Sequence, residues 1–310
     1  MGDFMNRKRL ILLVVILALV CGGSASAEAI LLTGARVLDP AGERWLEDHS
    51  VFVASGRISK IGPADRMRLA DDVRVIDLEG GYLLPGLIDL HSHLLLHPYD
   101  ETSWNDQVLR ESLELRTVRG VAAAQATLRA GFTTLRDLGT EGAAYADVAL
   151  RDAIEQGIVP GPRVLASTRA IVAVASYGPS GFDPRWKLPK GAQEANGVAG
   201  VRGAVREQVA AGADWIKVYA DYRRRAGGPS TPTFSQEELD ALVDEASVAG
   251  VPVSAHAATD EGIRRAVLAG ARTIEHGYGA SREVLEMMRE HEVGLCPTLA
   301  ASEAMAVYGG

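Results

Sequence analysis

Cysteine, aromatic residues and basic residues are all scarce in this chain of 310 residues. Cys21 and Cys296 are its two cysteines, so a disulfide framework cannot hold the fold together. Aromatic residues make up 5% of the chain, and 32 basic residues stand against 40 acidic ones, which gives a formal net charge of −8. This balance argues against nucleic acid as a partner, because binding to phosphates depends on clustered lysine and arginine. The hydrophobic content of 47% is that of a globular protein.

One hydrophobic run is long, and it lies at the N-terminus. The basic residues Arg7–Arg9 precede eleven apolar residues, Leu10–Val20, and the segment ends in Ala25–Ala27. This order is typical of a secretory signal peptide, whereas a membrane span needs roughly 20 apolar residues. We therefore predict a signal peptide over residues 1–27, cleavage after Ala27, export to the periplasm or the medium, and no stable membrane anchor afterwards. An uncleaved anchor and a lipid on Cys21 are the alternatives.

Cleavage would leave Cys296 as the remaining cysteine. It lies in the apolar run Val293–Pro297, which has the composition of a buried strand. We expect a core thiol there rather than a catalytic one, because free cysteine is among the most buried residue types.

Short apolar runs separated by turn residues fill residues 28–84, which predicts the N-terminal part of a small β-sandwich. The expected strands are Ala29–Leu32, Val51–Ala54, Arg57–Ile61 and Val73–Leu78. Gly34, Ser55-Gly56 and Gly80-Gly81 are among the turn residues between them.

Residues 85–310 alternate apolar runs with segments of helical period. The expected strands are Leu83–Leu90, Phe132–Leu138, Val164–Val172, Trp215–Ala220, Val251–Ala255, Arg272–Glu275 and Val293–Leu299. The expected helices are Val108–Ala130, Ala143–Gln156, Ala199–Ala211, Gln236–Ala249, Asp260–Ala269 and Arg282–His291. Such alternation predicts an α/β fold with parallel strands. A (β/α)8 TIM-like barrel, with strands 1–7 present and strand 8 missing, is favoured over a doubly wound sheet. No Gly-rich dinucleotide motif follows any expected strand, and polar residues gather at the carboxyl ends of strands.

Four histidines lie at those strand ends. His91 and His93 flank Ser92, and period-two geometry directs both imidazoles to the same side. His256 and His276 each follow another expected strand. Imidazole is a favoured ligand of zinc and related divalent metals, so the set predicts a metal site.

Lys217 lies inside the apolar strand Trp215–Tyr219, where a bare ammonium group is costly to desolvate. Such a lysine either pairs with a buried carboxylate or loses its charge and reacts with carbon dioxide to give a carbamate that can bridge two metal ions. Three further residues are candidate substrate-binding groups: Tyr177 and Tyr222 as pocket walls, and Arg223 as a partner for a substrate carboxylate.

In this order, the motifs Pro85–His93, Ile216-Lys217, Ala255-His256-Ala257 and Ile274-Glu275-His276-Gly277 resemble the metal-dependent amidohydrolase superfamily, over residues 30–310. The branch they resemble most has imidazolonepropionase-like and Xaa-Pro dipeptidase-like members. The resemblance implies two divalent metal ions, with zinc as first choice. His91 and His93 would bind the more buried ion, His256 and His276 the more exposed one, and carbamylated Lys217 both. It also implies hydrolysis of an amide, cyclic amide or dipeptide C–N bond by a metal-bridging hydroxide.

The sequence departs from this family in several places. The catalytic aspartate at the end of strand 8 has no counterpart in the 310 residues, so we expect a truncated gene or a partial sequence. A metal- or ligand-binding pseudoenzyme and a mononuclear imidazolonepropionase-like hydrolase therefore remain alternatives. Ala258 and Tyr177 stand where the dipeptidase branch often carries Tyr and His, which keeps cyclic amides open as substrates. The exact substrate, the metal (zinc, manganese, cobalt or iron) and association into a homo-oligomer are left open.

Overall fold

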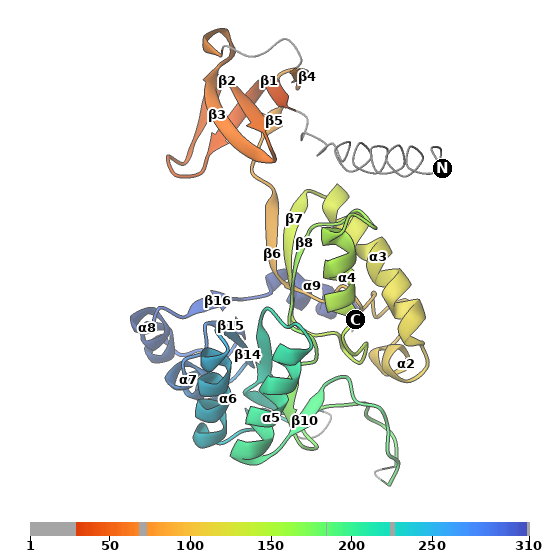
Figure 1. Ribbon diagram of the computed structural model, residues 1–310. Helices are drawn as coiled ribbons and strands as arrows, with labels where there is room; N and C mark the ends of the chain where they lie inside the picture. The colour runs from red at the N-terminus through yellow and green to blue at the C-terminus, as the bar shows by residue number, and fades with distance from the viewer. Residues whose placement is uncertain (1–28, 68–72, 184, 224–226, 309–310) are drawn as a thin grey trace, which may run out of the picture. The chain divides into compact units, whose positions relative to one another are not determined.

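The computed structural model describes residues 29–67, 73–183, 185–223 and 227–308 (Figure 1). The predicted signal peptide lies outside the described residues. The chain forms two compact units, Met1–Pro85 and Gly86–Gly310. In the part of the chain that the structure describes, none of the helices combines the length and hydrophobicity that a membrane crossing requires.

The first unit contains one sheet with the strand order β3-β2-β1-β4, and β5 also pairs with β1. Its elements are β1 (Ile30–Asp39), β2 (Arg44–Ala54), β3 (Arg57–Pro63), the short 3-10 helix η1 (Ala64–Arg66), β4 (Arg74–Asp77) and β5 (Tyr82–Leu83). The antiparallel β2–β3 hairpin turns at Ser55-Gly56, where both residues have positive φ. The prediction of a turn at Gly34 is wrong: this glycine, at φ +66°, lies at a bulge within β1, so the strand continues to Asp39.

The second unit alternates strands and helices, which confirms the predicted α/β class. Its strands are β6 (Leu87–Ser92), β7 (Phe132–Asp137), β8 (Arg163–Ala166), β9 (Ile171–Ala173), β10 (Gln193–Ala195), β11 (Ile216–Tyr219), β12 (Asp221–Arg223), β13 (Ser230–Pro232), β14 (Val253–Ala257), β15 (Thr273–His276) and β16 (Gly294–Cys296). Its helices are α2 (Trp104–Leu109), α3 (Leu113–Arg129), α4 (Ala146–Glu155), α5 (Gly197–Ala210), α6 (Gln236–Val248), α7 (Asp260–Ala269), α8 (Arg282–Glu290) and α9 (Leu299–Tyr308).

A closed barrel is not seen among the described residues. The parallel strands form two sheets, one with the order β6-β7-β8 and one with the order β10-β9-β11-β14-β15-β16, while β12 and β13 make a separate hairpin. The expected strand Val164–Val172 is in fact two strands, β8 and β9. Thr168 breaks it because its backbone is left-handed, with φ +61°, and its N–H donates to the buried carboxylate of Asp147. The expected helix Val108–Ala130 is likewise two helices, because Ser112 caps the N-terminus of α3.

The main core of this unit lies between the larger sheet and the helices α5, α6, α7 and α8, which Figure 1 shows side by side. Ile216 and Val218 of β11 are part of this core, and both are at most 1% exposed. Because side chains alternate along a strand, Lys217 and Tyr219 point to the opposite face of the same sheet. That face carries the candidate site.

Candidate metal centre

The four histidines predicted at strand ends lie together. Three distances between ring centroids connect them: His91 to His93 is 5.3 Å, His91 to His276 is 5.0 Å, and His256 to His276 is 4.5 Å. The parallel arrangement of β14 and β15 brings the last pair together, since Ala257 is in register with His276. Residues that are 185 positions apart in the sequence thus form one cluster of imidazoles.

In three of these rings, Nδ1 is held by a protein group. Nδ1 of His91 lies 2.7 Å from Oε2 of Glu275, Nδ1 of His93 lies 2.9 Å from the Gly139 carbonyl, and Nδ1 of His276 lies 2.8 Å from Oγ1 of Thr298. Within the described residues, Nε2 of each of these rings has no hydrogen-bond partner. Ligating histidines typically have this arrangement, in which one nitrogen is oriented by the protein and the other faces the metal.

His256 is turned the other way. Its Nε2 lies 3.8 Å from Oδ1 of Asp221, so Nδ1 is the nitrogen left free. Asp221 is fully buried and also accepts hydrogen bonds from the backbone N–H groups of Ala258 and Thr259, which directly follow β14. The same carboxylate therefore fixes the chain that follows His256 and lies near its ring.

Three of these histidines, His91, His256 and His276, are held in the neutral form. Burial, together with the nearby Lys217 charge, lowers the pKa of His91 and of His276 to about 3. Burial and the other histidines lower the pKa of His256 well below its ordinary value. Neutral imidazole is the form that binds a metal ion, so the surroundings favour ligation.

Lys217 is 1% exposed, and its Nζ has no hydrogen-bond partner among the described residues. Burial lowers the pKa of this amine to about 8, against the opposing effect of the Glu275 charge. Its Nζ lies 5.7 Å from the centroid of the Tyr219 ring, and Tyr219 is in register with His256. An unpartnered buried amine beside neutral imidazoles is costly unless a further group is bound there.

Glu275 joins the centre to the rest of the sheet. Besides His91, its carboxylate accepts hydrogen bonds from Arg136 Nη2 at 2.9 Å, Ser254 Oγ at 2.8 Å and Thr273 Oγ1 at 2.7 Å. Burial alone would raise its pKa, but the His91 hydrogen bond and the charges of Lys217 and Arg136 hold the pKa below its usual range. This carboxylate is thus a fixed negative charge next to the imidazoles.

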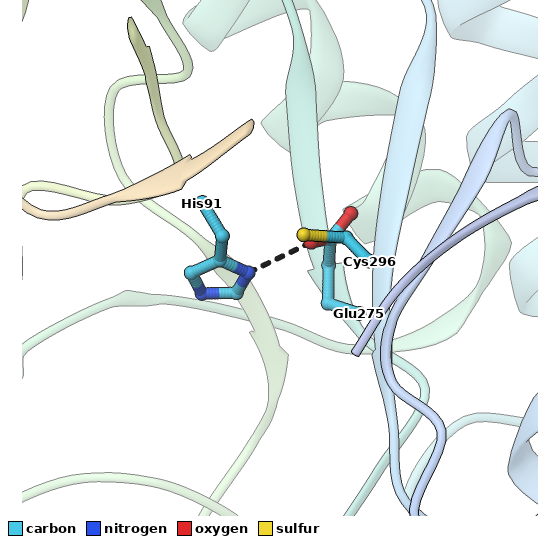
Figure 2. A group of neighbouring side chains, drawn as sticks. All are labelled: His91, Glu275 and Cys296. Atoms are coloured by element: carbon cyan, nitrogen blue, oxygen red, sulfur yellow. Dashed lines mark hydrogen bonds and ion pairs between the residues drawn. The ribbon is translucent and has the colours of Figure 1, made fainter. Parts of the chain in front are cut away.

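Cys296 approaches the same carboxylate. Potential ligand atoms of His91, Glu275 and Cys296 lie within 4.8 Å of one another, and Figure 2 shows the sulfur beside the hydrogen-bonded pair. The prediction of a core thiol in a buried strand is wrong, because β16 ends the sheet order and leaves Cys296 partly buried and Leu295 43% exposed. Burial and the Glu275 carboxylate raise the pKa of this thiol to about 11. The thiol, not the thiolate that binds metals, is therefore present at neutral pH.

The predicted substrate residues border an aromatic cluster. The ring of Tyr219 stacks on His256, with a centroid distance of 4.5 Å and an interplanar angle of 14°. Tyr177 and Tyr222 pack against each other at 5.1 Å, and each also contacts Tyr219. Arg223 is exposed, and its guanidinium carbon lies 5.6 Å from the Tyr222 ring centroid. The structure thus brings both tyrosines next to the histidines and places Arg223 at the outer end of the cluster.

With this geometry in view, comparison with known proteins gives the family. Residues 82–307 of this chain match the amidohydrolase family. The chain belongs to the amidohydrolase family.

Several proteins of known name resemble this amidohydrolase. Ochratoxinase from Aspergillus niger is 34% identical over 254 residues, which are 74% of this chain and 50% of that protein. The structure of a prolidase complexed with N-methylphosphonate-L-proline has a TM-score of 0.80 and 34% identity, over 91% of this chain and 69% of the other. A Xaa-Pro dipeptidase with bound methionine has a TM-score of 0.79 and 28% identity, with the same coverage. The chain spans about half the length of the curated relatives it matches.

Sequence reasoning about this amidohydrolase missed Glu275, Arg136 and Glu141. Glu275 and Arg136 are charged residues in strands that also contain other polar residues, so their burial is less evident from the sequence than that of Lys217. Glu141 lies in the loop between β7 and α4, where no periodicity marks a residue as buried, yet it is 3% exposed. For this residue the sequence offers no signal.

Proposed function

We propose that this chain carries the metal centre of a hydrolase that opens amide or related carbon–nitrogen bonds. The observation that carries the proposal is the set of four histidines, each with one ring nitrogen near a protein group, next to a buried lysine whose amine has no partner within the described residues. The prolidase and ochratoxinase neighbours support an amide or peptide as the substrate.

In this proposal His91, His93, His256 and His276 would hold two divalent ions, and Lys217 as a carbamate would supply further oxygen ligands. The neutral amine of Lys217 attacks carbon dioxide, a new N–C bond forms, and one proton is released to solvent. Burial lowers the pKa of this amine to about 8, so more of the neutral form is available for this step than an ordinary lysine provides. The orphaned Nζ fits this group, because a carbamate replaces an unpartnered amine with two oxygen ligands. Zinc is our first choice, since nitrogen and oxygen donors both suit it.

When bound, such ions lower the pKa of water and polarise a substrate carbonyl. The chain's own residues orient the ligands for this task. Glu275 fixes the tautomer and the ring direction of His91, and Asp221 lies 3.8 Å from Nε2 of His256 and holds the chain that follows this residue. Tyr219 packs flat against His256 and restricts its rotation. The neighbouring tyrosines exclude water from one side of the centre.

The test is the metal content of the full chain produced with added zinc and bicarbonate. We expect two zinc ions per chain and a mass increase of one carbon dioxide on Lys217. Lys217→Ala should lose both features, while Lys187→Ala, at an exposed position in the same unit, should keep them. A chain that binds one zinc ion or none and whose Lys217 is unmodified would contradict the carbamate-bridged centre. Two ions without hydrolysis of any dipeptide, N-acyl amino acid or cyclic amide would favour a metal-binding protein without this activity.

A further inference from the structure

A buried carboxylate lies in the aromatic cluster beside the histidines. Glu141 is 3% exposed. Its Oε2 accepts hydrogen bonds from Trp104 Nε1 at 2.9 Å and from the Tyr177 hydroxyl at 2.6 Å, and its Oε1 accepts one from the Tyr219 hydroxyl at 3.3 Å. Oε2 is therefore well satisfied, whereas Oε1 accepts one long hydrogen bond and has the capacity to accept a second.

All three donors to Glu141 are neutral. Among the described residues, none forms an ion pair with this carboxylate. Arg116 is buried nearby, but its N–H groups donate to the carbonyl oxygens of Leu95, Thr140 and Glu141 itself. Burial and the Glu141 charge raise the pKa of Tyr177 and Tyr219 well above its ordinary value, so both hydroxyls remain donors. The charges of Arg116 and Lys217 act on Glu141 from nearby, but none of its hydrogen bonds comes from a charged donor, so its carboxylate can still accept one from a cation.

Oε1 of Glu141 lies on the side of the metal centre. A Cβ atom on Gly139 would lie 3.6 Å from Oε1 of Glu141 and 3.8 Å from Cε1 of His93. Gly139 therefore lies between the Glu141 carboxylate and His93, a proposed metal ligand, and the glycine backbone is close to both. On the other side, Tyr219 donates to Oε1 and stacks on His256. The carboxylate and the histidines thus border the same part of the molecule.

The rings around Glu141 add to the attraction for a cation. Trp104 packs against Tyr177 at 5.2 Å, and Tyr177 packs edge-on against Tyr219 at 5.0 Å and Tyr222 at 5.1 Å. These rings direct their N–H and O–H groups at Glu141, and an aromatic lining is also compatible with an ammonium group.

We infer that Glu141 and its aromatic cluster bind a protonated amino group of the substrate. This inference rests on the proposed function and narrows it to amides and peptides with a free amine close to the bond that is cleaved. Blocking that amine as an amide removes the charge, and an anionic group at the same position would be repelled by Glu141.

The first test uses two probes that cannot be hydrolysed. Benzylammonium and benzyl alcohol have nearly the same shape, and only the first is a cation at neutral pH. We expect calorimetric titration of the full chain, with and without zinc, to show benzylammonium binding roughly tenfold or more tightly than benzyl alcohol, as for a hydrogen bond to a charged group. Equal affinities, or no measurable binding of either probe, would overturn the inference without any variant.

Two variants then assign the preference to one carboxylate. Glu141→Gln keeps the shape and removes the charge, so the preference for benzylammonium should disappear. Glu245→Gln, which removes a carboxylate that pairs with Arg202 and Arg206 on the surface, should keep it. A preference for benzylammonium that persists in Glu141→Gln would show that the amine binds elsewhere. A preference that requires zinc and is unchanged by this substitution would show that the amine binds at the metal. Either result would overturn the inference.

Hydrolysis separates this inference from the proposed function. The zinc-loaded full chain should cleave L-leucine p-nitroanilide with a higher kcat/KM than its N-acetyl derivative, and Glu141→Gln should reduce that ratio, which a purely structural role would leave unchanged. Cleavage of both compounds at the same ratio in both proteins would overturn the amine site alone. Cleavage of neither compound, together with a benzylammonium preference that depends on Glu141, would count against the proposed function and leave the amine site standing.

Discussion

Replacement of Glu275 by glutamine should affect both stability and metal binding, because this carboxylate accepts hydrogen bonds from four side chains of four different segments. Arg136 Nη2 is 2.9 Å away, and the side chains of Arg136 and Glu275 are 2% and 0% exposed. Glu275→Gln leaves the guanidinium buried without its counter-charge. Breaking a buried pair in this way costs about 3–5 kcal/mol of the free energy of unfolding.

The sign of the pH dependence follows from the lowered pKa of Glu275. The folded chain keeps this group ionised at a pH where the unfolded chain protonates it. Its contribution is therefore complete above the ordinary carboxyl pKa and is lost as the pH falls further. The difference between the wild type and Glu275→Gln should be measured at neutral pH, where it is largest.

Urea unfolding of the metal-free chain gives the stability, and a competition assay with a chelator gives the affinity for zinc. We expect Glu275→Gln to bind zinc about 10–100-fold more weakly, because His91 loses the group that orients its ring. The double variant Arg136→Met/Glu275→Gln should lose less stability than the two single losses together, with a coupling of about 0.5–3 kcal/mol. A loss below about 0.5 kcal/mol for Glu275→Gln, with unchanged zinc affinity, would refute this reasoning.

Three other predictions concern protons and processing. The metal-free chain should lose stability as the pH falls from about 6.5 toward 3, because the unfolded chain binds protons that the folded chain excludes. The loss should be about 1.4 kcal/mol per pH unit for each of His91 and His276. Equal midpoints of urea unfolding at pH 7 and pH 5 would contradict this prediction. Cys296, with a pKa of about 11, should react with iodoacetamide far more slowly than free cysteine at pH 8, and Glu275→Gln should speed the reaction; a rate like that of free cysteine would contradict the raised pKa of this thiol. The exported protein should begin at Glu28, as N-terminal sequencing can establish, and an intact Met1 after export would exclude cleavage.

The parts of the fold that the sequence predicts are those with a strong local signal. The apolar run around Val218 locates β11 because this strand is buried in a parallel sheet. The break at Thr168 was not predictable in this way. It depends on the carboxylate of Asp147, which is 21 residues away in the sequence and accepts the Thr168 N–H. Period and composition contain no information about such a contact.

In the candidate site, too, some residues are predictable from a local signal in the sequence and others are not. The four histidines stand out because they lie at the ends of expected strands, and Lys217 stands out because a charged residue inside an apolar strand is unusual. Their orienting partners are ordinary residues that gain a role only through long-range contacts: Glu275 is 184 positions from His91, and Gly139 is 46 positions from His93. Glu141 meets Tyr177 and Tyr219 across 36 and 78 positions. The sequence can therefore indicate ligands, while the groups that select one ring nitrogen over the other require the structure.

The orienting groups also explain why the centre and the fold should be stabilised together. Asp221 holds the chain after β14 through Ala258 and Thr259, and it also lies next to His256. Glu275 connects β6, β7, β14 and β15 through the side chains that donate to it. A metal ion that fixes the positions of these histidines also stabilises the arrangement of strands that the two carboxylates hold together. Bound metal ions should therefore raise the free energy of unfolding of the whole second unit. Replacement of either carboxylate should reduce this stabilisation by metal, although all the proposed metal ligands are still present.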